Sequence, residues 1–302
     1  MTERLFELDL SGPRAQRVHA VRQRTHLVDI ERDFPWESLD AGSYDPQLLE
    51  LARLGWTENA FNEFCTGAAM GQLITLMGQA QVPLDLWGIA CTFPEEELLH
   101  VELCSRVAMR LGGGMPLVYD SDDLVLDFEP GLSELQKVNE MIVRLCCVGE
   151  VFSLPMLVGS MRAATHPLTR AVLEQIVRDE SAHGRLGWLY LDWIGPRLDE
   201  AERRRLSRAA EDTAGGLRRV WERLRVRPHR PLPAGYSDIG WMEPADYLDA
   251  ARDALSNEIV AGLAQYGIEV DLTLPTLAPT KFTAPPGMPG SAGPRRGTLA
   301  GA

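Results

Sequence analysis

Two short segments decide the fold: residues 94–104, PEEELLHVELC, and residues 177–188, VRDESAHGRLGW. Each segment contains the pattern Glu-x-x-His, and the pairs are Glu97 with His100 and Glu180 with His183. Chance placement of six histidines and 24 glutamates in 302 residues predicts fewer than one such pair. Residues three apart lie on one face of an α-helix, so each pair can direct a carboxylate and an imidazole toward one metal ion.

A lone glutamate precedes each pair at the distance of a helical hairpin. Glu63, in FNEFCTGAAM, lies 34 residues before Glu97, and Glu150, in CVGEVFSLP, lies 30 residues before Glu180. At the rise of an α-helix, each lone glutamate reaches the height of its Glu-x-x-His in an antiparallel hairpin. Four buried carboxylates need compensating charge, which two divalent ions supply. The predicted ligands are Glu63, Glu97, His100, Glu150, Glu180 and His183.

The apolar periodicity predicts an all-α fold with four long helices. We expect them over residues 57–79, 84–111, 133–164 and 167–194, the first with Thr57 as its N-cap. Short turns join the first helix to the second and the third to the fourth, whereas residues 112–132 form a long crossover. Two hairpins joined by one long crossover are a known topology of four-helix bundles.

The segments outside the bundle are expected to pack on it or to extend from it. A helix is predicted over residues 14–33, and further helices over 199–224 and 244–266. The basic run Arg203–Arg205 indicates a solvated helix face. The last residues are rich in Pro, Gly, Ala, Thr and Ser, which favours a disordered tail. The expected units are an N-terminal lead over 1–56, the bundle over 57–194, additional helices over 195–273 and the tail over 274–302.

The four motif segments together resemble the ferritin-like diiron carboxylate superfamily, over about residues 57–194. The resemblance implies a ferritin-like bundle whose six predicted ligands hold two iron ions in a carboxylate-bridged site. Two manganese ions or a mixed Mn/Fe pair are the alternatives. In oxygen-activating members, the acidic residue directly before each Glu-x-x-His often forms a hydrogen bond with the ligand histidine of the other pair. Asp179 would then orient His100, and Glu96 would orient His183.

The resemblance also implies a range of activities. The leading expectation is a stand-alone oxidase or oxygenase that uses O2 on a small organic substrate, served by an electron donor. The alternatives are a ferroxidase or manganese catalase-like protein, and a non-enzymatic metal-binding module. Cys104 stands where ribonucleotide reductase subunits carry a radical tyrosine, and Ile176 stands where aromatic-amine oxygenases add a histidine. Both differences argue against those two families, and a homodimer is a further expectation.

Other residues near the motifs receive structural interpretations. Glu58 is assigned to a helix N-terminus, where an acidic side chain is favourable, and Glu140 to solvent. Glu95 and Glu102 are expected at the surface. Pro94 indicates a helix start or kink close to the ligands, and Pro155 indicates a kink in the third long helix. Cys65, Cys104 and Leu154 are candidate neighbours of the centre.

Composition limits the partners and the compartment. The chain is 45% hydrophobic and 24% charged, and its formal net charge of -13 disfavours nucleic acids and anionic membranes. We find no long uninterrupted apolar run and no secretory signal, so we expect a cytoplasmic protein without a membrane span. Five cysteines without a CxxC pattern indicate buried free thiols in a reducing compartment.

Overall fold

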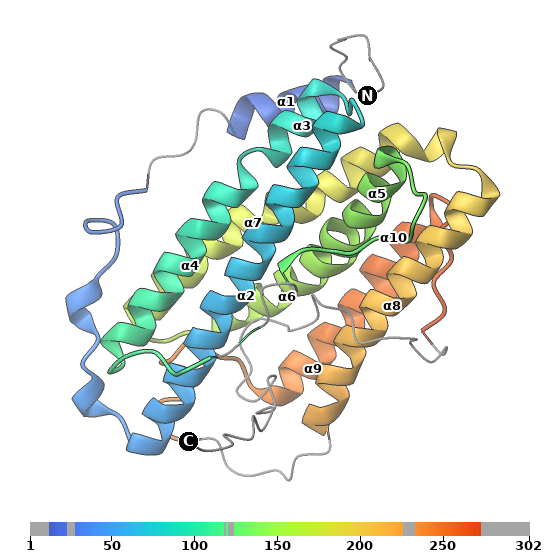
Figure 1. The fold of residues 1–302 in the computed structure, drawn as a ribbon. Coiled ribbons are helices and arrows are strands. Elements are labelled where there is room, and N and C mark those ends of the chain that lie inside the picture. Colours follow the sequence, from blue (N-terminus) through green and yellow to red (C-terminus); the bar gives the residue numbers. More distant parts are fainter. Residues whose placement is uncertain (1–11, 23–27, 118, 120–123, 226–232, 273–302) are drawn as a thin grey trace, which may run out of the picture.

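The computed structural model describes residues 12–22, 28–117, 119, 124–225 and 233–272. Within these residues every regular element is a helix, which confirms the predicted all-α class (Figure 1). The tail predicted over 274–302 lies outside the described residues. The elements are α1 (Pro13–Arg22), η1 (Trp36–Ser38), η2 (Ala41–Ser43), α2 (Pro46–Gln79), α3 (Leu84–Ala90), α4 (Phe93–Arg110), α5 (Glu134–Met141), η4 (Ile142–Glu150), α6 (Val151–Ala163), α7 (Pro167–Ile194), η5 (Gly195–Arg197), α8 (Glu200–Arg225), α9 (Pro244–Asp253), η6 (Ala254–Val260) and α10 (Ala261–Ala264).

Four long helical segments lie side by side and form the body of the protein (Figure 1). They are α2, the pair α3 and α4, the continuous run α5–η4–α6, and α7. The helices α8, α9 and α10 cover one flank of this body, and α1 packs against α3 at one end. The helix expected over 14–33 is shorter than predicted, because α1 ends at Arg22 and residues 30–32 form a turn.

Helix α2 begins much earlier than the sequence analysis predicted. Asp45 caps it by accepting a hydrogen bond from Gln47 N, and Pro46 occupies the first turn, where its missing N–H costs nothing. The predicted start at Thr57 is wrong, because the Thr57 hydroxyl donates to Arg53 O inside the helix. The helix-terminus role of Glu58 is therefore also wrong, and its side chain is buried in the middle of α2.

The helix expected over 84–111 is broken into α3 and α4. The break falls at Cys91 and Thr92, and the Thr92 hydroxyl donates to Ile89 O instead of capping α4. Pro94 lies in the first turn of α4, where proline is tolerated but cannot continue a preceding helix. A new helix start thus precedes Glu97 by one turn, as one of the two readings of Pro94 anticipated.

The third segment is a single helical run of changing geometry. Ser133 and Gln136 form a capping box at its start, as the pattern of a helix N-terminus requires. Residues 142–150 then adopt the wider π-helical form, which ends at Glu150, before α6 carries Pro155 in its interior. Helix–helix contacts on both sides make this run the central element of the fold.

The run Glu134–Ala163 is also long and apolar enough to cross a membrane by length and composition. No such segment was expected from the sequence. Of an apolar stretch of 18 residues within this run, 67% is buried inside the protein. The run packs against α7, α8 and α9. Packing in a protein core accounts for the apolar character of this helix.

Two charged residues predicted at the surface are buried in the contact between α5 and α8. Arg205 lies 2.5 Å from Glu140 Oε2 and 2.8 Å from Glu202 Oε1, and its side chain is only 12% exposed. The solvent assignment of Glu140 is therefore wrong. The solvated face predicted for Arg203–Arg205 is right only for Arg204, since Arg203 also donates to backbone carbonyls.

The cysteines are free thiols, as predicted, but not all are buried. Cys104, Cys146 and Cys147 are fully enclosed, whereas Cys65 is half-buried and Cys91 is exposed at the break between α3 and α4. The predicted surface positions of Glu95 and Glu102 are confirmed.

Gly55 provides a test of how α2 packs on the segment before α9. A Cβ on Gly55 would lie 2.2 Å from Trp241 Cζ2, whereas a Cβ on Gly71 of the same helix meets nothing within 4 Å. We expect Gly55→Ala to destabilise the protein by about 1–3 kcal/mol through overpacking. Gly71→Ala is expected to stabilise it by up to about 1 kcal/mol through helix propensity. Urea unfolding measures both, and the reverse ranking would contradict the packing of Trp241.

Candidate metal centre

The structure brings the six predicted ligands together at mid-height between four helical segments. Glu63 comes from α2, the first Glu-x-x-His from α4, Glu150 from the end of η4, and the second Glu-x-x-His from α7. All six side chains are buried, with exposures between 0 and 7%. Their ligand atoms form two groups, each within 4.8 Å, and the groups are Glu63, Glu97, His100, Glu180 and Glu97, Glu150, Glu180, His183.

Two glycines allow the helices to approach one another at the level of the centre. A Cβ on Gly67 of α2 would lie 3.2 Å from Glu97 Cβ, so a larger residue would push α4 away. A Cβ on Gly184 of α7 would lie 3.3 Å from Val151 Cγ2, directly after Glu150. The two glycines thus allow the helix that carries Glu63 or Glu150 to lie close to the helix that carries the corresponding Glu-x-x-His.

The two shared carboxylates divide their oxygens between the two histidines. His183 Nδ1 lies 3.0 Å from Glu97 Oε1 and 3.1 Å from Glu180 Oε2. His100 Nδ1 lies 3.9 Å from Glu97 Oε2 and 3.3 Å from Glu180 Oε1, with Glu63 Oε2 at 3.5 Å. Each of Glu97 and Glu180 therefore presents one oxygen to each half of the centre, which is the arrangement of a bridging carboxylate.

Several polar atoms of the centre lack a hydrogen-bond partner among the described residues. They are both carboxylate oxygens of Glu97, Oε2 of Glu180, and Nδ1 of His100 and of His183. Buried polar atoms without partners are costly, and these five atoms face one another. Carboxylate oxygens with two imidazoles are the donor set that suits iron or manganese better than zinc or copper. The residues present therefore fit a pair of such ions.

Outer carboxylates hold the two imidazoles in position. His100 Nε2 lies 3.2 Å from Asp179 Oδ2, and His183 Nε2 lies 2.9 Å from Glu96 Oε2. In the tautomer protonated at Nε2, each ring donates to its carboxylate and turns the Nδ1 lone pair toward the centre. Asp179 is itself held by Gln175, whose amide donates to Oδ2 at 2.7 Å.

Burial and mutual charge shift the pKa values of the buried ligand side chains. Burial, and then the charge of Glu180, raise the pKa of the Glu97 carboxyl well above its usual value, and burial does the same for Glu150. Burial by itself lowers the pKa of His100 and His183, but the surrounding carboxylates raise it well above the usual value. Because a metal ion competes with protons for these side chains, metal affinity is expected to rise with pH.

Three further residues lie near the centre without having been identified from the sequence. The Phe93 ring lies 4.0 Å from the His183 ring, and Gln175 orients Asp179 from one turn away on α7. Cys146 lies close enough for the charges of Glu150 and His183 to affect its pKa, which burial raises. Of the three, only Gln175 could have been identified from the sequence, because residues four apart on a helix, such as Gln175 and Asp179, can form a hydrogen bond.

The predicted neighbours of the centre divide into two kinds. Cys104 is fully buried one turn after His100, and burial, followed by the charges of Glu63 and Glu97, raises the pKa of its thiol. Cys65 and Leu154 are half-buried. Of the three, Cys104 is the one that the electrostatics place beside the carboxylates.

Removal of an outer carboxylate is expected to weaken metal binding without removing a ligand. Asp179→Ala or Glu96→Ala should lower affinity for Fe(II) or Mn(II) by about 10–100-fold, because the imidazole loses its orienting hydrogen bond. Competition with a chromophoric chelator measures this loss. Glu174→Ala, at an exposed position on α7, is the matched control and should bind as the wild type does. Equal affinity in all three variants would contradict the orienting role.

Comparison with known proteins adds no relative: no protein-family model matches the chain, and neither a curated protein nor a solved structure matches it.

Proposed function

We propose that this chain is a ferritin-like diiron oxidase or oxygenase that uses O2 to oxidise a small organic molecule. One observation carries the proposal: the buried centre contains two groups of ligand atoms that share Glu97 and Glu180. A mononuclear site would need only one such group. The donor set of four carboxylates and two imidazoles matches a charge of +4 on two divalent ions.

The arrangement of the helices supports the ferritin-like part of the proposal. Two helical segments each contribute one glutamate, and two contribute a Glu-x-x-His, which is the plan of ferritin-like dimetal bundles. The long crossover between α4 and α5 and the short turns within each hairpin agree with that plan.

The chain's own residues would prepare the centre for redox chemistry. Glu97 and Glu180 would be shared between the ions, Glu63 and His100 would complete one half, and Glu150 and His183 would complete the other. Two ferrous ions bound there would supply the electrons that reduce O2. Burial of the centre excludes bulk water, and the carboxylates of Asp179 and Glu96 keep both imidazoles aimed inward.

The test begins with the protein purified without O2 and loaded with Fe(II). We expect two irons per chain and, on addition of O2, an absorbance band of an oxidised dinuclear iron centre. Glu180→Ala is the negative control for the site, and Glu174→Ala is the control for the handling of the protein. Fewer than one iron per chain, or no reaction of bound Fe(II) with O2, would overturn the proposal.

The organic substrate is tested in the same sample. Excess Fe(II) that is oxidised and stored, with no dependence on any added organic compound, would favour a ferroxidase over an oxygenase. Faster O2 consumption on addition of one class of small molecule, together with an oxidised product, would support the oxygenase and identify its substrate class. We propose a separate electron donor because catalytic turnover must return the irons to the ferrous state.

A further inference from the structure

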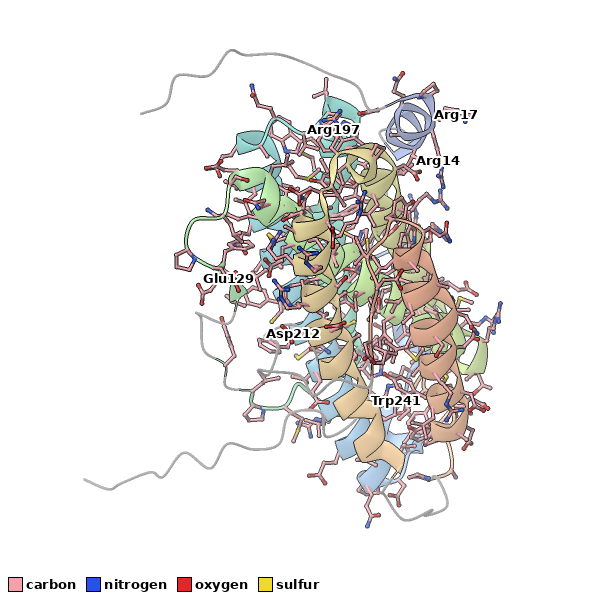
Figure 2. All side chains as sticks on the ribbon, turned by 90° about the vertical axis from the view of Figure 1, so that its right-hand side faces the viewer. Arg14, Arg17, Glu129, Arg197, Asp212 and Trp241 are labelled. Atoms are coloured by element: carbon pink, nitrogen blue, oxygen red, sulfur yellow. The ribbon has the colours of Figure 1, made fainter. Side chains whose placement is uncertain are left out.

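A pair of oxidisable rings connects the end of α7 with the protein interior. Tyr190 is fully buried, Trp193 is half-buried, and their ring centroids lie 5.4 Å apart in an edge-to-face arrangement. The guanidinium of exposed Arg197 lies 4.7 Å above the Trp193 ring, and Figure 2 shows Arg197 at the upper end of the molecule. The two rings thus extend from the surface at this end into the core.

The inner ring is aligned with the metal centre. Tyr190 follows His183 by seven residues, so both lie on the same face of α7, separated by about 10 Å along the helix. Gly187 lies between them, and Cys147 Sγ fills the space beside it, 2.7 Å from where a Cβ would be. The path between Tyr190 and His183 is therefore packed protein that includes a polarisable sulfur atom.

The Tyr190 phenol also has a buried route for its proton. Its hydroxyl donates to Asn139 Oδ1 at 2.7 Å, and Asn139 Nδ2 donates to Glu202 Oε1 at 2.8 Å. A phenol that loses an electron becomes a strong acid, so its proton must move when the ring is oxidised. The hydrogen bond gives the proton a short path, and the Glu202 carboxylate stabilises positive charge on the amide.

We propose that Tyr190 and Trp193 relay electrons from the protein surface to the metal centre when O2 is activated in the absence of organic substrate. This inference rests on the proposed function. One electron passes from Tyr190 to the oxidised centre while the phenolic proton shifts toward Asn139 Oδ1. An electron from Trp193 restores Tyr190, and the proton returns. The oxidised indole releases its N–H proton to water and is restored by one electron and one proton from a soluble reductant such as ascorbate.

The first test uses the full chain loaded with Fe(II) and mixed with O2 without substrate or ascorbate. Freeze-quench electron paramagnetic resonance should detect an organic radical in the wild type. Tyr190→Phe should lose it, and Trp193→Phe should retain a tyrosyl signal that decays at least tenfold more slowly. Iron content and Fe(II) oxidation are measured in each sample, so a failure of the proposed function is recognised separately.

Trp188→Phe is the matched control for this test. Trp188 also forms a Trp–Tyr pair at this end of α7, stacked on Tyr266 at 6.4 Å. It follows His183 by only five residues and lies about 140° around the helix from it. The radical in Trp188→Phe should match that of the wild type, and an equal loss in this variant would overturn the assignment to Tyr190 and Trp193.

A second test needs no metal. Azide radicals generated by pulse radiolysis oxidise tryptophan selectively, so this test follows electron exchange between the same two rings in the reverse direction. Tyr190 reduces the Trp193 radical, the indolyl absorbance decays and the tyrosyl absorbance grows. In the metal-free chain we expect the amplitude of this intramolecular phase to fall in Tyr190→Phe and in Trp193→Phe, and the part that remains is expected from the other Trp–Tyr pairs, Trp188 with Tyr266 and Trp241 with Tyr236. An unchanged amplitude in both variants would overturn the relay, whatever the iron-loaded protein does.

Discussion

Replacing Glu180 by Ala is expected to reduce bound metal from two ions to fewer than one per chain while the helical fold remains. Glu180 presents one oxygen to His100 and the other to His183, so its loss damages both halves of the centre. His183→Ala should remove at least one ion, because it takes away the only imidazole of its group. Metal analysis of protein loaded with Fe(II) or Mn(II), with far-ultraviolet circular dichroism for the fold, provides the measurement.

Thermal unfolding gives the same prediction an independent readout. A ligand at one hundred times its Kd stabilises the native state by about 2.7 kcal/mol, which is about 4 °C in Tm for a chain of 302 residues. We expect the wild type and the exposed-site control Glu174→Ala to show this rise when metal is added, and Glu180→Ala to show none. Two metals per chain in both Glu180→Ala and His183→Ala would show that the site is wrongly assigned.

The second large effect is expected far from the centre, at Arg205. Its guanidinium contacts Glu140 and Glu202 and also donates to Gln136 O. The side chains of Arg205, Glu140 and Glu202 are each no more than 12% exposed. Arg205→Met would leave the buried carboxylate of Glu202 without its cation, and Glu140 would keep only Arg144, which lies 2.9 Å from its other oxygen. Breaking a buried ion pair from one side typically costs about 3–5 kcal/mol, so we expect a loss of that order in the free energy of unfolding.

The neighbouring arginine is the natural control. Arg204 is 60% exposed and pairs with the exposed Glu200, so Arg204→Met should cost less than about 1 kcal/mol. Equilibrium urea unfolding of the two variants side by side separates the buried pair from a general effect of charge removal. Similar midpoints for Arg205→Met and the wild type would contradict the burial of this network.

The candidate site was more accessible to sequence reasoning than the fold around it. The spacing of Glu97 from His100 and of Glu180 from His183 is a local property, and helix rise extends it to Glu63 and Glu150. These six residues do meet in the structure, although their role as ligands stays a prediction. The hydrogen bonds of Asp179 and Glu96 to the opposite imidazoles came from the family resemblance, since nothing local pairs residues 79 and 87 positions apart.

The errors in the fold have physical causes that can be traced to particular residues. Asp45 and Pro46 carried the start signal of α2, but Thr57 offered a second one inside the helix. The pairing of Glu140 with Arg205 joins residues 65 apart, and no periodicity reveals it. The π-helical form of residues 142–150 has no compositional signature, because the residues Ile, Val, Leu and Cys there also suit an α-helix.

The π-helical segment has a consequence for the angular phase of the helix that contains it. A hydrogen bond from residue i to i+5 encloses one residue more than an α-helical bond, so each such turn offsets the faces before and after it. Asn139 and Glu140, before the offset, point to α8, and Glu150, at its end, points to the centre. Deleting one residue between 142 and 148 would rotate the first group relative to Glu150 by about 100°. A single insertion or deletion there would therefore change the angle between the residues that contact α8 and Glu150 at the centre, without replacing any of these residues.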